Sequence, residues 1–157
     1  MTFESVIKFI VSLSLPLLVG AVAGITTAKA IPTWYATLNQ PSFNPPNWVF
    51  GPVWTVLYIV MGISLYLVWV QAPGKERNLA LAVFGVQLLL NFGWSYIFFY
   101  YRNLGLALAE IIVLWLAILV MMVFFHRVRP VAAYLNIPYL LWVTFASVLN
   151  GAYFSLN

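Results

Sequence analysis

The chain has 157 residues, of which 64% are apolar and 6% are charged, whereas an ordinary soluble domain is about 45–50% apolar and about 25% charged. Seven Lys or Arg and three Asp or Glu residues are too few to cover a soluble fold of this size, so the composition predicts an integral membrane protein. The absence of cysteine and the single histidine, His126, exclude disulfides, thiolate sites and multi-histidine metal or haem sites. No metal and no cofactor are expected, and the net charge of +4 is interpreted as a topology signal rather than as nucleic-acid binding.

Five apolar runs follow one another along the chain, separated by clusters of charged residues, Pro, Gly and Asn. Crossing a hydrocarbon core about 30 Å thick takes roughly 20 helical residues, and each run is long enough. The pattern therefore predicts an all-α integral membrane protein, with residues 1–157 forming a single five-helix transmembrane bundle. The expected helices cover residues 5–28, 48–70, 79–100, 104–125 and 131–154, with a long loop over residues 29–47.

Lys and Arg are shared unevenly between the two ends of this predicted bundle. Five lie on the side of the N-terminus, namely Lys8, Lys75, Arg77, Arg127 and Arg129. The opposite side carries Lys29 and Arg102. Because cytoplasmic connections carry an excess of Lys and Arg, the N-terminus is expected in the cytoplasm and the long first loop outside.

The first loop, residues 29–47, combines prolines with aromatic residues. Proline fixes its own φ and restricts the residue before it, so this segment is expected to be stiff. Rigidity and aromatic density suggest a lid over a site between the helices, although Trp34 and Trp48 also suit simple anchoring at the membrane interface. The expected lid residues are Trp34, Tyr35, Pro41, Phe43, Pro45 and Pro46.

Polar residues at membrane depth are few, and they share helix faces with large aromatic side chains. Gln87 and Asn91 are four residues apart on the third predicted helix, and Trp94 and Phe98 continue their face. Amides of this kind often only join neighbouring helices by hydrogen bonds. Together with aromatic faces they also suit a flat, mostly apolar ligand. Similar faces on the second and fifth helices contain Trp54, Tyr58, Met61, Tyr139, Trp142, Ala146, Leu149, Asn150 and Tyr153.

Two further features of the apolar runs leave alternatives open. Glu110 is the one carboxylate expected at membrane depth, and it suits a proton carrier, a helix cap or a partner of Arg102 near the helix end. No second acid and no Ser–His–Asp set accompany it, so conventional hydrolytic catalysis has no support. Gly20 and Gly24 form a G-x-x-x-G pattern, which fits either a close internal helix contact or a dimer face.

Four segments together form a longer pattern that covers essentially the whole chain. They are the paired-proline loop Trp34–Pro46, the segment Val53–Tyr58, the series Gln87, Asn91, Trp94, Phe98 and Phe99, and the segment Pro138–Asn150. In order and spacing this pattern resembles the translocator protein family, also called tryptophan-rich sensory proteins or peripheral-type benzodiazepine receptors.

The resemblance implies a five-helix bundle, commonly a homodimer, with a pocket under the first loop that binds porphyrins and synthetic benzodiazepine-site ligands. By position, Trp54 and Trp142 match the facing pocket tryptophans, and Asn91 matches an amide that bonds a ligand carbonyl. The implied ligand-binding residues are Trp54, Tyr58, Asn91, Trp94, Phe98, Trp142, Ala146 and Leu149.

The chain also departs from the family pattern at two places. Many members have Lys where this chain has Gln40 and Trp where it has Phe43, so a lid charge that would meet a porphyrin propionate is missing. The sterol-recognition pattern of animal members needs Lys or Arg shortly after a Tyr on the fifth helix, and neither follows Tyr153. Weak cholesterol binding and a prokaryotic plasma membrane are therefore expected.

Three functions compete at this point. The leading one is a tetrapyrrole receptor, transporter or sensor. The first alternative is light- and oxygen-dependent degradation of porphyrin, with a photochemical role for Trp54 and Trp142, since no side chain here supplies redox chemistry in the dark. The second alternative is a proton-coupled exporter of flat aromatic compounds, with Glu110 as the proton carrier.

Overall fold

The computed structural model describes residues 2–157, and the regular structure in that range is helical throughout, without strands. Five helical segments are long and apolar enough to cross a membrane. They are Phe3–Ala30, Asn47–Trp69, Lys75–Tyr100, Leu104–Val128 and Pro130–Leu156. The prediction of an all-α protein with five membrane-spanning helices is confirmed at this level.

Three of the five segments are built around one long α-helix each. These are α1 (Phe3–Ala30), α2 (Phe50–Trp69) and α4 (Leu104–Val128). The third segment joins α3 (Lys75–Ser95) to a short π-helix, η3 (Tyr96–Tyr100), and the last is divided into α5 (Pro130–Tyr134) and α6 (Ile137–Leu156). The loop between α1 and α2 contains two 3-10 turns, η1 (Tyr35–Thr37) and η2 (Asn47–Val49).

Most helix ends differ from the sequence prediction by one to four residues, and two of the differences have a clear physical reason. The third helix begins at Lys75 rather than at residue 79, because a charged first turn remains helical where it no longer has to lie in hydrocarbon. The fifth helix is not continuous, since the chain turns at Leu135–Asn136 before α6. The buried amide of Asn136 fixes this break by donating to Ser64 Oγ on α2 at 2.6 Å and to the Ala132 carbonyl at 2.8 Å.

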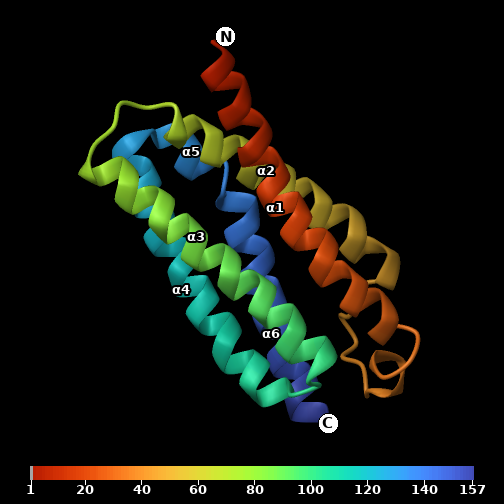
Figure 1. Cartoon of the computed structure of the whole chain (residues 1–157). Coiled ribbons are helices and arrows are strands. Elements are labelled where there is room, and N and C mark those ends of the chain that lie inside the picture. Colours follow the sequence, from red (N-terminus) through yellow and green to blue (C-terminus); the bar gives the residue numbers. More distant parts are fainter. Residues whose placement is uncertain (1) are drawn as a thin grey trace.

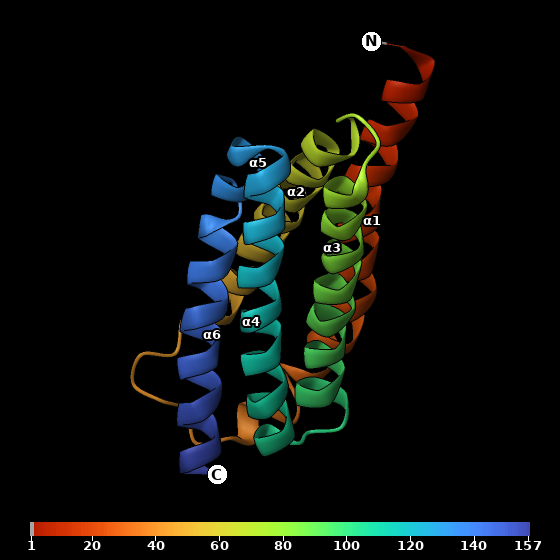
Figure 2. The same cartoon turned by 90° about the vertical axis from the view of Figure 1, so that its left-hand side faces the viewer.

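The helices run lengthwise beside one another, with the two termini at opposite ends of the bundle (Figure 1). Helix α1 packs on α2 and α3, and α4 packs on α3 and α6; the turned view shows α4 between α3 and α6 (Figure 2). The loop between α1 and α2 lies at the same end as the C-terminus. The molecule therefore has a loop end and an N-terminal end.

The N-terminal half of the bundle is closely packed. Phe84 of α3 and Phe125 of α4 stack with ring centroids 6.0 Å apart and planes 10° from parallel, and both side chains are buried. Helices α1 and α2 meet at Gly62, where an added Cβ would lie 2.8 Å from Leu13 Cα. Only glycine permits this approach, so no space for a ligand remains between the helices here.

Candidate ligand-binding site

The loop half of the bundle contains a cavity of about 530 Å³ between α1, α2, η3 and α6. Ligand pockets for small molecules are typically about 300–1,000 Å³, so the volume suits a sizeable organic molecule. Within residues 2–157, no Lys, Arg, Asp or Glu side chain lines it. Seven of the eight residues that the resemblance implied line this cavity, namely Trp54, Tyr58, Trp94, Phe98, Trp142, Ala146 and Leu149.

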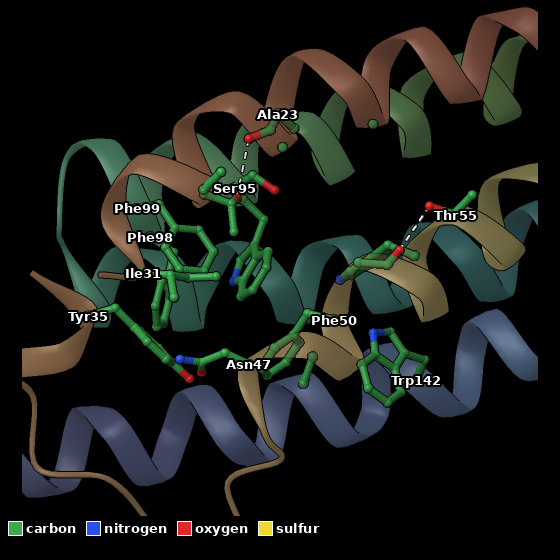
Figure 3. Close-up of a pocket in the computed structure, with 18 of the residues that line it drawn as sticks. Ala23, Ile31, Tyr35, Asn47, Phe50, Thr55, Ser95, Phe98, Phe99 and Trp142 are labelled. Carbon is green, nitrogen blue, oxygen red and sulfur yellow. Dashed lines mark hydrogen bonds between the residues drawn. The ribbon is translucent and has the colours of Figure 1, made fainter. Parts of the chain in front are cut away.

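The two tryptophans in question belong to two walls of the cavity, Trp54 to α2 and Trp142 to α6. Trp54 on α2 stacks on Tyr58 with centroids 5.6 Å apart at 27° and meets Tyr139 of α6 edge-on at 6.3 Å. Trp142 on α6 contacts Phe50 of α2 edge-on at 6.2 Å. These aromatic pairs fix the ring orientations. Figure 3 shows the Trp142 ring at one end of the group of lining side chains.

The opposite end of the cavity is closed by the lid loop. Tyr35 is buried among aromatic rings, with centroids 6.3 Å from Phe98 and 5.1 Å from Tyr153, and Figure 3 shows it beside Phe98 and Phe99. The Tyr153 hydroxyl bonds to that of Tyr35 at 2.7 Å, and Tyr35 donates to Asn44 Oδ1 at 3.0 Å. Burial, followed by the contact with Tyr153, raises the pKa of the Tyr35 phenol, so the hydroxyl stays protonated as a donor.

The other expected lid residues surround this closed end. Trp34 packs edge-on against Phe98 at 5.8 Å, and Phe43 approaches Phe145 of α6 at 6.4 Å. Pro41 is buried, while Pro45 and Pro46 directly precede the turn η2. The loop thus covers the cavity through aromatic contacts.

Asn91 is the implied binding residue that does not line the cavity. Its Oδ1 accepts from the Tyr58 hydroxyl at 2.6 Å and its Nδ2 donates to Tyr139 Oη at 3.0 Å. Tyr139 in turn donates to Gln87 Oε1 at 2.8 Å. Asn91 lies behind Tyr58, and its amide joins α2, α3 and α6. A bond from Asn91 to a ligand carbonyl stays a prediction and would require this network to open.

The contribution of α1 to the cavity was not predicted from the sequence, because small apolar residues carry no chemical signal. Gly20, Ala21, Ala23, Gly24 and Thr27 all line it. The one available signal was the G-x-x-x-G pattern, and its first glycine marks an internal contact. A Cβ on Gly20 would overlap the ring of Tyr58, whereas a Cβ on Gly24 would meet no atom within 4 Å.

Glu110 lies outside the cavity. Both of its carboxylate oxygens are buried without a hydrogen-bond partner in the described chain, and Gly93 of α3 is its neighbour. The alternative in which Glu110 pairs with Arg102 is wrong, because the ion pairs among residues 2–157 are Lys8–Glu4 and Arg127–Glu76. The Arg102 guanidinium instead lies 5.9 Å from the centre of the Trp34 ring. Over the same residues no cluster of His, Cys, Asp or Glu suits a metal ion.

Comparisons with known proteins identify the family. The model of the TspO/MBR family matches residues 12–155. The chain is 39% identical to the tryptophan-rich protein TspO of Archaeoglobus fulgidus over 98% of this chain and 99% of that protein. It is 40% identical to the protein of the same name in Chlorobaculum tepidum over 98% of both chains. It is also 42% identical to the human translocator protein over 74% of this chain and 70% of that protein. Matches of this extent show that the chain belongs to the TspO/MBR family.

Proposed function

We propose that this chain is a membrane receptor, carrier or sensor for a tetrapyrrole, which binds in the cavity beneath the lid between Trp54 and Trp142. The observation that carries the proposal is a cavity of about 530 Å³ with indole rings in two walls and no charged lining side chain. A flat conjugated macrocycle can stack on these faces, with each aromatic contact contributing about 0.5–1.5 kcal/mol beyond burial. Synthetic ligands of the benzodiazepine-site class would occupy the same space.

A tryptophan-fluorescence titration tests this proposal. The protein is placed in lipid nanodiscs and titrated with protoporphyrin IX, iron protoporphyrin and biliverdin, because its seven tryptophans report on any bound chromophore. We expect saturable quenching with one ligand per chain. Ala146→Phe, which fills the cavity, should abolish it, whereas Gly85→Phe on α3 should not, because Gly85 is outside the cavity and has free space around it. Linear, unsaturable quenching in the parent would contradict the proposal.

A second candidate function is light- and oxygen-dependent porphyrin degradation. Its support is that two oxidisable indoles, Trp54 and Trp142, line the same cavity, so a bound porphyrin would lie beside them when excited. Illuminated and dark samples of protein with protoporphyrin IX separate the two functions. Without a protein-dependent product in the light, binding alone remains.

We also propose a prokaryotic plasma membrane as the location, with the N-terminus in the cytoplasm. This orientation rests on five Lys or Arg at the N-terminal end of the bundle against Lys29 and Arg102 at the loop end. A homodimer is proposed as the assembly. Because Gly20 is occupied by its contact with Tyr58, the dimer face would lie elsewhere on the lipid-facing surface. Cholesterol is expected to bind weakly, and a submicromolar cholesterol affinity would overturn that expectation.

A further inference from the structure

One side of the cavity is not covered by protein. Most of its lining residues are buried or half-buried, but several on α1 and near the start of α2 are exposed. They are Ala21, Gly24, Ala28, Asn47, Trp48, Gly51 and Thr55. All seven belong to the first two membrane-spanning segments. Three of them lie on α1 and four lie on η2 and the first turns of α2. We call the opening between these two groups the α1–α2 slot.

The slot begins where the close contact between α1 and α2 ends. Around Gly62, and again where Gly20 meets the ring of Tyr58, the two helices touch so closely that a Cβ would not fit. Nearer the loop, a Cβ on Gly24 or on Gly51 would meet no atom within 4 Å. Ala21 and the last residue of α1, Ala30, are nine helical steps apart, or about 14 Å along the helix. The slot is therefore an elongated gap in the loop half of one lipid-facing side.

Two threonine side chains at or beside the slot bond to carbonyls of their own helices. The Thr27 hydroxyl donates to the Ala23 carbonyl at 3.3 Å, and the Thr55 hydroxyl donates to the Gly51 carbonyl at 2.9 Å, each within its own helix. Figure 3 shows the bonded pair at Thr55. Because these hydroxyl hydrogens are already bonded within their own helices, an apolar molecule passing the two threonines would displace no hydrogen bond.

The aqueous end of the cavity, in contrast, is fastened. Asn157 at the end of α6 accepts from the Asn39 backbone N–H at 2.8 Å and donates to the Asn39 carbonyl at 3.1 Å. The Asn39 side chain also donates to the Leu156 carbonyl at 3.1 Å. Together with the Tyr153–Tyr35–Asn44 hydrogen bonds, these contacts hold the lid on α6 from two directions.

We propose that the ligand enters and leaves the cavity sideways from the bilayer, through the α1–α2 slot, while the lid stays fastened to α6. The inference rests on the proposed function, since it concerns the route of the same ligand. Apolar ring systems concentrate in the hydrocarbon region, so a lateral opening meets them at their highest concentration. The lid then stays in place during ligand exchange and separates the cavity from the aqueous phase.

Stopped-flow quenching by protoporphyrin IX in lipid vesicles tests the route with two sets of variants. The first narrows the slot with Gly24→Ala, Gly24→Leu and, from the other side, Gly51→Leu; Gly85→Leu on α3 is the matched control, because Gly85 also has free space around it but does not line the cavity. The second fastens the lid covalently with Asn39→Cys plus Asn157→Cys, joined by a disulfide or a short dithiol reagent. The chain has no cysteine of its own, so reduction releases only this bond.

We expect both association and dissociation to slow progressively from Gly24→Ala to Gly24→Leu, the latter by about tenfold or more, with Gly85→Leu unchanged. The covalently fastened lid should leave both rates within about twofold of the reduced sample. If the covalent bond between lid and α6 stops ligand exchange and its reduction restores exchange, the ligand passes through the lid and the inference is wrong. Parent-like exchange in both leucine variants would also overturn it. Absence of saturable binding by the parent at equilibrium would contradict the proposed function itself, and the route with it.

Discussion

The same two helices, α1 and α2, pack closely in one half of the bundle and separate in the other. In the N-terminal half α1 and α2 are in backbone contact at Gly62, and aromatic rings such as Phe84 and Phe125 fill the remaining space. In the loop half the same helices leave a free gap at Gly24 and Gly51, beside a cavity of about 530 Å³. Glycine permits close packing in one half and leaves space in the other. Whether a glycine allows close packing or leaves open space depends on the residues opposite it, not on the glycine itself.

The polar side chains differ between the halves in the same way. Ser64 and Asn136, in the N-terminal half, bond to each other and to a carbonyl, and they fix the turn between α5 and α6. In the loop half the Tyr58–Asn91–Tyr139 network lies behind the cavity wall and holds the aromatic rings that face the ligand. The packed half therefore supports a preformed site, whose empty volume costs stability that the rest of the bundle offsets.

The largest expected difference in stability comes from adding a methyl group to a glycine in the N-terminal half and to one in the loop half. Gly62→Ala should lower the free energy of unfolding by about 1–3 kcal/mol, because the new Cβ meets backbone atoms of α1. Gly24→Ala should instead stabilise the protein by about 0.5–1 kcal/mol through helix propensity. Unfolding in SDS, followed by circular dichroism, measures both. Equal effects of the two substitutions would contradict the difference between the halves.

Removal of the Tyr58 hydroxyl sharpens the comparison between polar networks. Tyr58→Phe leaves Asn91 Oδ1 buried without its donor, so we expect a loss of about 1–3 kcal/mol in the same unfolding assay. Tyr66→Phe on the same helix is the matched control, since its hydroxyl bonds Ser5 in a partly buried contact and should cost less. A larger loss for Tyr66→Phe would show that the network behind the cavity is not the critical one.

Replacement of either cavity tryptophan separates binding from photochemistry. Trp54→Phe or Trp142→Phe keeps an aromatic face, so protoporphyrin IX affinity should fall by less than about tenfold, or 1.4 kcal/mol. Light-driven porphyrin loss, where it occurs, should fall much further because it needs the oxidisable indole. Quenching titrations and absorbance under illumination provide the two readouts. If both variants bind and degrade porphyrin like the parent, these tryptophans do not belong to the site.

The smallest effect is expected at the lid. Asn157→Ala removes the acceptor of the Asn39 backbone N–H, an exposed hydrogen bond with a net value of about 0.5–1.5 kcal/mol. Amide exchange at Asn39 should accelerate by up to about tenfold, with no change in global unfolding. Hydrogen–deuterium exchange mass spectrometry measures this against α4, whose amides serve as the internal control. Unchanged exchange in the loop would mean that Asn157 does not hold the lid.

The sequence was sufficient to predict the helices and most of the aromatic wall, and the reason is periodicity. Trp54 and Tyr58 recur at helical spacing within an apolar run, so their shared face follows from the sequence alone. The break at Asn136 was missed because residues 131–154 read as one apolar run, and only contacts with α2 reveal the turn.

Two other features depend on packing that no single helix encodes. The contribution of Gly24 to the cavity depends on where α1 separates from α2, which is a property of the pair. The position of Asn91 behind Tyr58 likewise depends on how three helices meet. From the sequence, Asn91 could be placed on the same helix face as Gln87, Trp94 and Phe98. Its position behind Tyr58, outside the cavity lining, could not be predicted.

The most direct test of the proposed site is ¹⁹F NMR of protein labelled with 5-fluorotryptophan. The seven tryptophans yield separate resonances, and single Trp→Phe variants assign them. On addition of protoporphyrin IX, ring currents should shift the signals of the tryptophans that line the cavity, which are Trp48, Trp54, Trp94 and Trp142. Trp115, which bonds Thr144 away from the cavity, should not move. A strong shift of Trp115 with Trp54 and Trp142 unchanged would contradict the assignment of the cavity as the tetrapyrrole site.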